Sequence, residues 1–265
     1  MKDVTTVAVV TGGGTGIGRA VATKLASQGV SVVICGRREE MIRAAEEHIH
    51  TTAGVDVLGV PCDIRDPEGV TRLFEQAESH FGAPVTVLVN NAGGQFPCDA
   101  LKLTPGGWRA VVDTNLNGTF WCSQQFAKRL VAAQLEGVIL NMTIPWHSRG
   151  SAGLSHAVAA RSGVVGLTRS LALEWARFGI RVNCISPGMV VTEGFIDEEL
   201  DGNADAVSQA ISTVPLGRAT SEEEVAEVMV HMVSPAYSYM TGHTLNLDGG
   251  AVLGVGINWL DPELT

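Results

Sequence analysis

The chain has 265 residues, of which 45% are hydrophobic and 17% charged, and it carries a net charge of −10 at neutral pH. This length suits one large α/β domain. The acidic balance, without any basic run interleaved with aromatic residues, excludes general affinity for nucleic acid or anionic membranes. No apolar run approaches the ~18 residues of a membrane span, and the opening "MKDVTTVAVVTGGG" is too quickly polar for a signal peptide. We therefore expect a cytoplasmic globular protein.

The predicted elements alternate between short β-branched runs and longer stretches of helical period. Strands are expected at "TTVAVVTG", "VSVVICG", "VDVLGVPCD", "VTVLVNNAG", "GVILNMT", "IRVNCISPG" and "HTLNLDGG". Helices are expected over residues 17–29, 39–51, 66–81, 104–130 and 155–178. Strands that are almost wholly apolar and alternate with helices form a parallel sheet covered on both faces. Residues 1–265 are thus predicted to form a single doubly wound Rossmann domain of the α/β class, with about seven parallel strands.

Two segments depart from this alternation. Residues 189–220 are polar, acidic and follow a strand end, which is typical of a substrate loop and almost equally of a plain surface excursion. The tail after Gly250, "AVLGVGINWLDPELT", is apolar, so it covers either an edge of the core or another subunit. The five cysteines (Cys35, Cys62, Cys98, Cys122 and Cys184) lack metal-ligand spacing, which predicts reduced thiols and no metal site.

The first strand runs into "TGGGTGIGRA", where Gly12, Gly16 and Gly18 form a turn that opens a helix. Glycines allow a tight turn and close backbone approach, so a pyrophosphate can bind at the helix N-terminus. Because the pattern lies between a strand and a helix at the start of an α/β chain, a merely structural turn is the weaker interpretation.

The end of the second strand indicates which dinucleotide is bound. A carboxylate that holds the ribose 2′-hydroxyl of NAD belongs about 20 residues after the glycines. This chain has Gly36 there, followed by Arg37 and Arg38. Guanidinium groups suit a 2′-phosphate, so the sequence predicts NADP(H), unless the arginines merely begin an exposed helix.

Together these motifs resemble the short-chain dehydrogenase/reductase superfamily along almost the whole chain. "TGGGTGIG" is similar to its cofactor loop, Asp63 in "CDIRD" to its adenine-contacting acid, "NNAG" to its strand-four turn and "SPGMVVT" to its nicotinamide-side turn. The resemblance implies a homotetramer or homodimer that acts on a small molecule. It also implies cofactor contacts from Gly12, Gly14, Thr15, Gly16, Ile17, Gly18, Arg37, Arg38, Asp63, Ile64, Asn91, Ala92, Gly93, Arg161, Pro187, Gly188, Val190 and Thr192.

A closer resemblance exists within the superfamily. "NNAGGQF", "GWRAVVDTNLNGTF", "ARSGVVGLTRSLALEWARFGIRVNC" and "GHTLNLDGG" resemble the peroxisomal trans-2-enoyl-CoA reductases and, more distantly, the 2,4-dienoyl-CoA reductases. These families use NADPH to reduce a carbon–carbon double bond conjugated to a thioester. The resemblance therefore implies an enoyl-thioester substrate.

The catalytic pattern of the superfamily is broken in this chain. Ser162-Gly163-Val164 aligns the usual Tyr-x-x-x-Lys so that Ala157 replaces the tyrosine and Arg161 replaces the lysine. The usual serine falls at or beside Ile144. An arginine donates hydrogen bonds to ribose hydroxyls but stays protonated, so it cannot pass a proton on. Alanine cannot protonate an alkoxide as the tyrosine phenol does. Alcohol–ketone chemistry by the usual route is therefore disfavoured.

Enoyl reduction requires less, because hydride goes to the β-carbon and the thioester oxygen becomes enolate-like. The candidate catalytic residues are Asn115, Thr143, Arg161, Trp146 and His147. Trp146 occupies the position to which dienoyl-CoA reductases move their tyrosine, and His147 beside it is the better proton donor near neutral pH. For His156, a structural role within the helix is a better explanation than a role as an acid. For Gln95, a hydrogen bond within its loop is as good an explanation as a place at the mouth of the active site.

Three hypotheses follow. The first is an NADP(H)-dependent reductase of an activated C=C bond. The second is a carbonyl reductase or alcohol dehydrogenase with a rearranged proton donor. The third is a cofactor-binding protein without redox turnover, which the missing Tyr-x-x-x-Lys supports and the intact cofactor motifs oppose.

Overall fold

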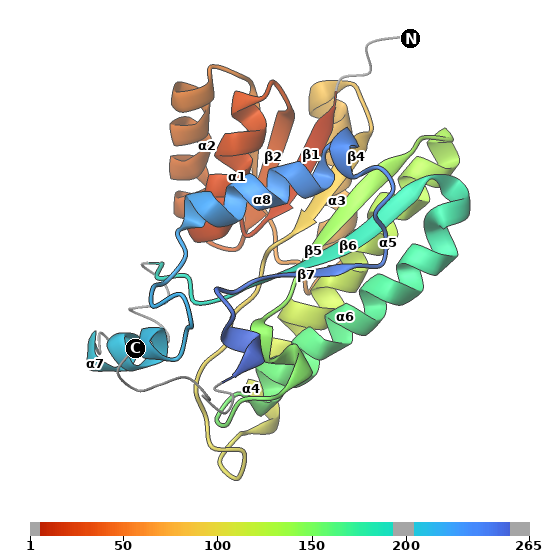
Figure 1. Cartoon of the computed structure of the whole chain (residues 1–265). Helices are drawn as coiled ribbons and strands as arrows, with labels where there is room; N and C mark the ends of the chain where they lie inside the picture. Colours follow the sequence, from red (N-terminus) through yellow and green to blue (C-terminus); the bar gives the residue numbers. More distant parts are fainter. Residues whose placement is uncertain (1–5, 193–203, 255–265) are drawn as a thin grey trace.

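A computed structural model describes residues 6–192 and 204–254, and within them a seven-stranded sheet is the centre of the fold (Figure 1). The strands are β1 (Val7–Thr11), β2 (Ser31–Gly36), β3 (Val57–Pro61), β4 (Val85–Asn90), β5 (Gly137–Met142), β6 (Ile180–Pro187) and β7 (Thr244–Leu247). All neighbours pair in parallel, in the order β3-β2-β1-β4-β5-β6-β7. The predicted seven-stranded Rossmann domain is therefore confirmed.

Helices cover both faces of this sheet. The helices are α1 (Gly16–Ser27), α2 (Glu39–Ala53), α3 (Pro67–Phe81), α4 (Pro105–Val112), α5 (Gly118–Ala133), α6 (Ser155–Trp175), α7 (Ala204–Ser212) and α8 (Glu222–Val233). Helix α1 packs between α2 and α8, whereas α5 packs against α3 and α6 (Figure 1). Two buried apolar clusters result, one on each side of the sheet. Within the described residues, no helix is both long and apolar enough to span a bilayer.

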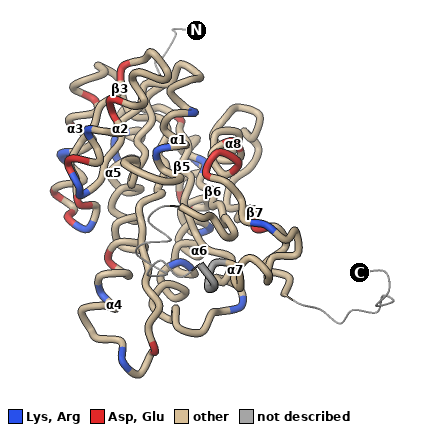
Figure 2. Tube along the Cα trace, turned by 90° about the vertical axis from the view of Figure 1, so that its left-hand side faces the viewer, with Lys and Arg blue, Asp and Glu red and all other residues tan. Residues whose placement is uncertain are grey.

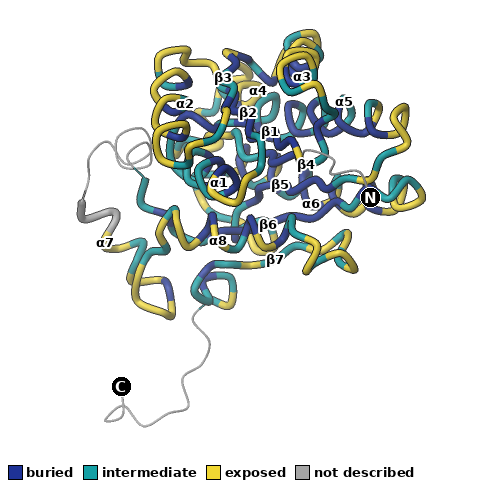
Figure 3. The backbone as a smooth tube through the Cα atoms, turned by 90° about the horizontal axis from the view of Figure 1, so that it is seen from above, coloured by how far each residue is buried: buried dark blue, intermediate teal, exposed yellow. Residues whose placement is uncertain are grey.

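Along a strand, successive side chains point to opposite faces of the sheet and so enter the two clusters in turn. In β1, Ala8 and Val10 face the α1 side, and Val7 and Val9 face the α3–α5 side. Among the strands of the described residues, only β6 carries a charged residue, Arg181. Figure 3 shows the strands buried and the outer helix faces exposed, and Figure 2 shows charges gathered on α2 and α3. The sheet is thus buried on both faces, as parallel sheets are.

The helix expected over residues 104–130 is divided in the structure. Helix α4 ends at Val112, a π-helical turn covers Asp113–Asn117, and α5 continues from Gly118. The π turn occurs where Asn115 uses its side chain to hold a neighbouring loop. A hydrophobic period alone does not reveal such a bulge, because the helix axis continues through it.

The segment 189–220 contains α7 and an isolated bridge between Val190 and Thr220. The rest of the expected substrate loop, residues 193–203, and the tail after residue 254 lie outside the described residues, so both expectations remain predictions.

A series of buried hydrogen bonds runs along one face of the sheet, from α5 over β4 and β5 to α6. The central bond joins Asn90 Nδ2 on β4 to Asn141 Oδ1 on β5 at 2.8 Å, and both residues are buried. The series runs through Asn115 O, Thr119, Ser123, Asn90, Asn141, Thr168 and Val164 O. Buried polar groups that are paired in this way fix the relative position of the elements that carry them.

Replacing Asn141 with alanine is expected to lower the free energy of unfolding by about 2–4 kcal/mol. The change removes two buried hydrogen bonds, to Asn90 and to Thr168, and leaves a small cavity. Urea unfolding followed by circular dichroism measures the difference. Asn117→Ala, which removes one half-buried bond to Asp113, is the control and should cost less than about 1 kcal/mol. Equal losses in the two variants would contradict the structural importance of the series.

Candidate functional site

A groove opens at the carboxyl ends of the strands, beside the point where the strand order reverses between β1 and β4. In open α/β sheets, ligands bind in this position. We call it the long groove, and it is lined by Gly12, Gly14, Thr15, Gly16, Ile17, Cys35, Gly36, Arg37, Arg38, Met41, Ile42, Cys62, Asp63, Ile64, Asn91, Ala92, Gly93, Gly94, Gln95, Thr114 and Thr192.

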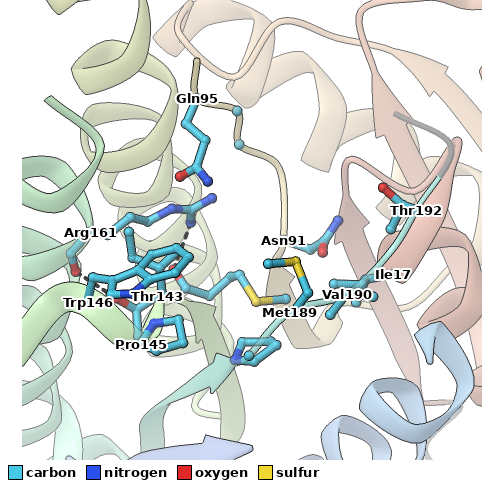
Figure 4. Close-up of a pocket in the computed structure, with 16 residues that line it drawn as sticks. Ile17, Asn91, Gln95, Thr143, Pro145, Trp146, Arg161, Met189, Val190 and Thr192 are labelled. Atoms are coloured by element: carbon cyan, nitrogen blue, oxygen red, sulfur yellow. Dashed lines mark hydrogen bonds between the residues drawn. The ribbon is translucent and has the colours of Figure 1, made fainter. Parts of the chain in front are cut away.

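The long groove continues into a second cavity, the inner pocket, which Figure 4 shows from close by. It is lined by Ile17, Asn91, Gly93, Gly94, Gln95, Met142, Thr143, Ile144, Pro145, Trp146, Arg161, Pro187, Gly188, Met189, Val190 and Thr192. Six of these residues also line the long groove: Ile17, Asn91, Gly93, Gly94, Gln95 and Thr192. A ligand that enters one cavity therefore borders the other.

The glycine loop after β1 has the backbone that its sequence predicts. Gly12 and Gly16 have positive φ angles of 65° and 57°, which glycine adopts at little cost. Gly18 lies beneath the loop, where a Cβ atom would collide with the carbonyl oxygen of Gly12 and lie 2.5 Å from Asn91 Nδ2. Helix α1 begins directly after Thr15, whose side chain makes no cap hydrogen bond. The first amide groups of α1 therefore adjoin the groove without a side-chain cap, which suits an anion.

Basic and acidic side chains meet at the other end of the long groove. Arg37 and Arg38 follow β2 and are exposed. The single Nε–H of Arg65 is shared between the two carboxylate oxygens of Asp63, each 2.9 Å from Nε, and this pairing is the main cause of the lowered pKa of Asp63, with a smaller contribution from Arg37. The carboxylate of Asp63 is therefore ionised and already partnered by Arg65.

Arg161 of α6 projects into the inner pocket (Figure 4). Its side chain is only 7% exposed, and its Nη1 donates to the carbonyl of Met142 at 2.7 Å. Its other terminal nitrogen, Nη2, lies against Gly93, where a Cβ atom would overlap it. The pocket therefore contains a cation fixed by β5 on one side and by the Gly93 backbone on the other.

Thr143 also lines the inner pocket, but its hydroxyl donates to the carbonyl of Arg161 at 2.9 Å. The single proton of this hydroxyl is thus used to join β5 to α6. Trp146 and Gln95 line the pocket as well, and both are labelled in Figure 4.

Asn115 is fully buried, and among the described residues it is not one that lines either cavity. It accepts a hydrogen bond from the backbone N–H of Gly94 and donates one to the carbonyl of the same residue, both at 3.0 Å. The structure places it behind the Gly93–Gln95 segment, so in this conformation it acts on the loop.

The two candidate histidines lie elsewhere. His147 is not among the described lining residues of the inner pocket, and its neighbours are Asn246 on β7 and Arg169. Burial lowers the pKa of His147. His156 is fully buried with its ring centroid 4.6 Å from that of Phe96, and burial lowers its pKa too. The 3₁₀ turn Pro145–Ser148 places His147 near Asn246 of β7, and its role as a proton donor stays a prediction.

The sequence did not single out the apolar side chains that enclose the inner pocket, namely Met142, Pro145 and Met189. Nor did it place Cys35 and Cys62 at the long groove. All five lie at or just after the carboxyl end of a strand. That position, where parallel strands present their ligand-facing residues, is the signal that identifies them.

A model of the family described as enoyl-(acyl carrier protein) reductase matches residues 12–252. The chain belongs to the short-chain dehydrogenase/reductase family. It is 38% identical over 255 residues to a probable 2,4-dienoyl-CoA reductase of Bacillus subtilis, with 96% of each chain covered. It is 35% identical to a peroxisomal 2,4-dienoyl-CoA reductase of Danio rerio, covering 93% of this chain and 81% of that protein.

Solved structures agree with this assignment. An actinorhodin polyketide ketoreductase variant crystallised with NADPH superposes with a TM-score of 0.87 at 33% identity, covering 94% of this chain and 97% of that one. This short-chain dehydrogenase/reductase is therefore an oxidoreductase with a nucleotide-cofactor-binding Rossmann domain that acts on small molecules. Within the parts of the chain that the structure describes, no group of three or more His, Cys, Asp or Glu side chains is arranged to hold a metal ion.

Proposed function

We propose that this protein is an NADP(H)-dependent reductase of an activated carbon–carbon double bond, with an enoyl thioester as substrate. One observation carries the proposal: the inner pocket holds a fixed guanidinium, Arg161, at the position of the usual lysine, while Ala157 at the position of the usual tyrosine is fully buried. Such a pocket can stabilise a developing enolate oxygen. The similarity to dienoyl-CoA reductases supports the same substrate class.

The long groove fits a dinucleotide. The positive φ angles of Gly12 and Gly16 and the close approach at Gly18 make a cradle that any side chain would fill. Gly12, Gly14, Thr15, Gly16, Ile17 and Gly18 would hold the pyrophosphate, and Arg37 and Arg38 a 2′-phosphate. Asp63, Ile64, Asn91, Ala92 and Gly93 would border the adenosine and central parts. Pro187, Gly188, Val190, Thr192 and Arg161 would border the nicotinamide end.

When bound, the nicotinamide cofactor would supply the hydride for the β-carbon, and a water molecule would supply the proton that the α-carbon takes up. Arg161 then donates hydrogen bonds to the thioester oxygen as negative charge accumulates on it, since a guanidinium remains charged in the pocket. Met142, Pro145 and Trp146 exclude water from one wall. Asn115 positions the Gly93–Gln95 segment, and Thr143 holds the Arg161 turn of α6 to β5.

Parallel assays test this proposal. NADPH oxidation is measured with a trans-2-enoyl-CoA, a 2,4-dienoyl-CoA, a β-ketoacyl-CoA and simple ketones. Turnover of the C=C substrates without the ketones is the expected result. Turnover of ketones alone would instead establish carbonyl reduction with another proton donor, and tight NADPH binding with no turnover would establish a cofactor-binding protein.

Replacing Arg37 with aspartate is expected to raise the Kd for NADPH at least ~30-fold and to change the Kd for NADH little. The guanidinium would lose its contact with the 2′-phosphate, and the new carboxylate would repel it. Fluorescence titration of both cofactors measures the two constants. Arg43→Ala is the control, since Arg43 pairs with Glu39 on the exposed face of α2 and does not line the described groove. Equal losses for NADPH and NADH would refute the preference.

We further propose that the protein forms a homodimer or homotetramer in the cytoplasm and that residues 189–220 border the substrate. Light scattering after gel filtration tests the first point, and cross-linking of a substrate analogue tests the second.

A further inference from the structure

Three buried thiols cluster beside the long groove. Cys35 lies on β2, Cys62 follows β3, and Cys122 lies on α5, and all three belong to the buried cluster on the α3–α5 side of the sheet. Cys35 pairs in register with Val60, and the N–H of Cys62 donates to the carbonyl of Gly36 at 2.9 Å. Because side chains two residues apart on a strand share a face, Cys62 projects to the same side as Val60 and Cys35.

Only two of these thiols reach the groove. Cys35 and Cys62 line it, with Cys62 8% exposed, whereas Cys122 is fully buried and is not among the described lining residues. A small solute in the groove can therefore reach Cys62, whereas Cys35 borders the groove but is fully buried.

The two thiols are chemically unequal. The interaction with Cys35 lowers the pKa of Cys62 despite burial and the nearby carboxylates of Asp63 and Asp66. The same interaction, together with burial, raises the pKa of Cys35. The thiolate is the reactive form of cysteine, so Cys62 is the nucleophile of the pair and Cys35 the second thiol.

Cys35 is also joined to the glycine loop. The nearby backbone of Gly12 partly offsets the rise in the pKa of Cys35, and the carbonyl of Cys35 accepts a hydrogen bond from Gly13 N at 3.2 Å. Gly12 lines the groove, so a change in the position of this sulfur is transmitted to the loop that holds the pyrophosphate in our proposal.

We propose that Cys62 and Cys35 form an oxidative modification site in which a hydroperoxide links the two thiols and so reduces cofactor binding. The Cys62 thiolate attacks one oxygen of hydrogen peroxide, the O–O bond breaks, and the departing hydroxide takes a proton to become water, leaving a sulfenic acid. The Cys35 sulfur then attacks the Cys62 sulfur, loses its proton, and displaces a second water as the disulfide forms. Two thiols are oxidised and one peroxide is reduced to two waters.

This modification and cofactor binding should oppose each other. A disulfide draws the Cys35 sulfur away from Gly12, and a nucleotide in the groove covers Cys62. The inference depends on a dinucleotide in the long groove but not on the enoyl substrate, so cofactor binding serves as its readout whatever the reductase assays show.

The test treats the reduced, full-length protein with hydrogen peroxide, with and without saturating NADP⁺ or NAD⁺. Peptide mapping under non-reducing conditions should recover a Cys35–Cys62 linked peptide, formed at least ~5-fold more slowly when the tighter-binding dinucleotide is present. The Kd of that dinucleotide should rise at least ~10-fold after oxidation and recover with dithiothreitol.

Cys62→Ser should abolish the link and the peroxide-induced change in Kd, while Cys98→Ala, which removes a more exposed thiol outside the groove, should keep both. A link to Cys122 in place of Cys35, oxidation that leaves the Kd unchanged, or equal rates with and without dinucleotide would each overturn the proposal. Because wild-type protein gives the decisive mapping, a poorly folded variant would not obscure the result.

Discussion

Replacing Arg161 with alanine is expected to lower kcat/KM for an enoyl thioester at least ~100-fold, which corresponds to about 3 kcal/mol of transition-state stabilisation. The side chain is 7% exposed, is anchored to Met142 O, and is the one lysine or arginine among the described residues that line the inner pocket. Its removal takes away the guanidinium that would stabilise the negative charge on the substrate oxygen. Steady-state kinetics with saturating NADPH measures the loss, and most of it should appear in kcat.

Arg169→Ala is the matched control for this prediction. Arg169 lies on the same helix but is exposed and is not one of the described residues that line the pocket, so its loss should change kcat/KM less than about 2-fold. Arg161→Lys should recover part of the enoyl activity without any ketone turnover, because position 157 still lacks a phenol. If Arg161→Ala and Arg169→Ala have equal activities, the arginine is purely structural.

Replacing Gly18 with alanine is expected to raise the Kd for NADPH at least ~100-fold. The new methyl group would overlap the carbonyl oxygen of Gly12 and crowd Asn91 Nδ2, and the first of these is backbone that cannot move without opening the loop. The loop and the start of α1 would separate, so the amide groups would no longer converge on a pyrophosphate. Isothermal titration calorimetry measures the affinity.

The control for this change is Gly166→Ala, on α6, where a Cβ atom would meet nothing within 4 Å. Alanine at an exposed position within a helix stabilises it by up to about 1 kcal/mol, so this variant should fold and bind NADPH normally. Circular dichroism of Gly18→Ala establishes whether weak binding arises from the loop or from global unfolding. A native spectrum with native affinity would contradict the close packing at Gly18.

The fold was largely predictable from the chain because its signals are local and repeated. Each strand is a β-branched apolar run that ends in a turn, and the glycine loop occupies the position where a strand meets a helix. The order of the strands, by contrast, was not predicted, since a hydrophobic pattern shows that a strand is buried but not which strands lie beside it.

The site was less predictable because it depends on the direction of individual side chains. Trp146 and His147 are adjacent in the sequence, yet the 3₁₀ turn at Pro145–Ser148 places the first in the inner pocket and the second towards β7. Thr143 reaches the pocket with its proton already donated to Arg161 O. Hydrogen-bond partners, which sequence position does not reveal, decide what each of these residues can contribute.

The buried series from Asn115 to Val164 bears on how the chemistry of such a protein can diverge. It joins the π-helical turn whose Asn115 holds Gly94 to the helix that carries Arg161, and the side chains in it come from α5, β4, β5 and α6. None of its hydrogen bonds involves the side chain at position 144, 157 or 161, where the usual serine, tyrosine and lysine are missing. The scaffold that spaces the reacting groups is therefore separable from the groups themselves. A protein built in this way can exchange its acid and its cation and still present a site of the same dimensions to a new substrate.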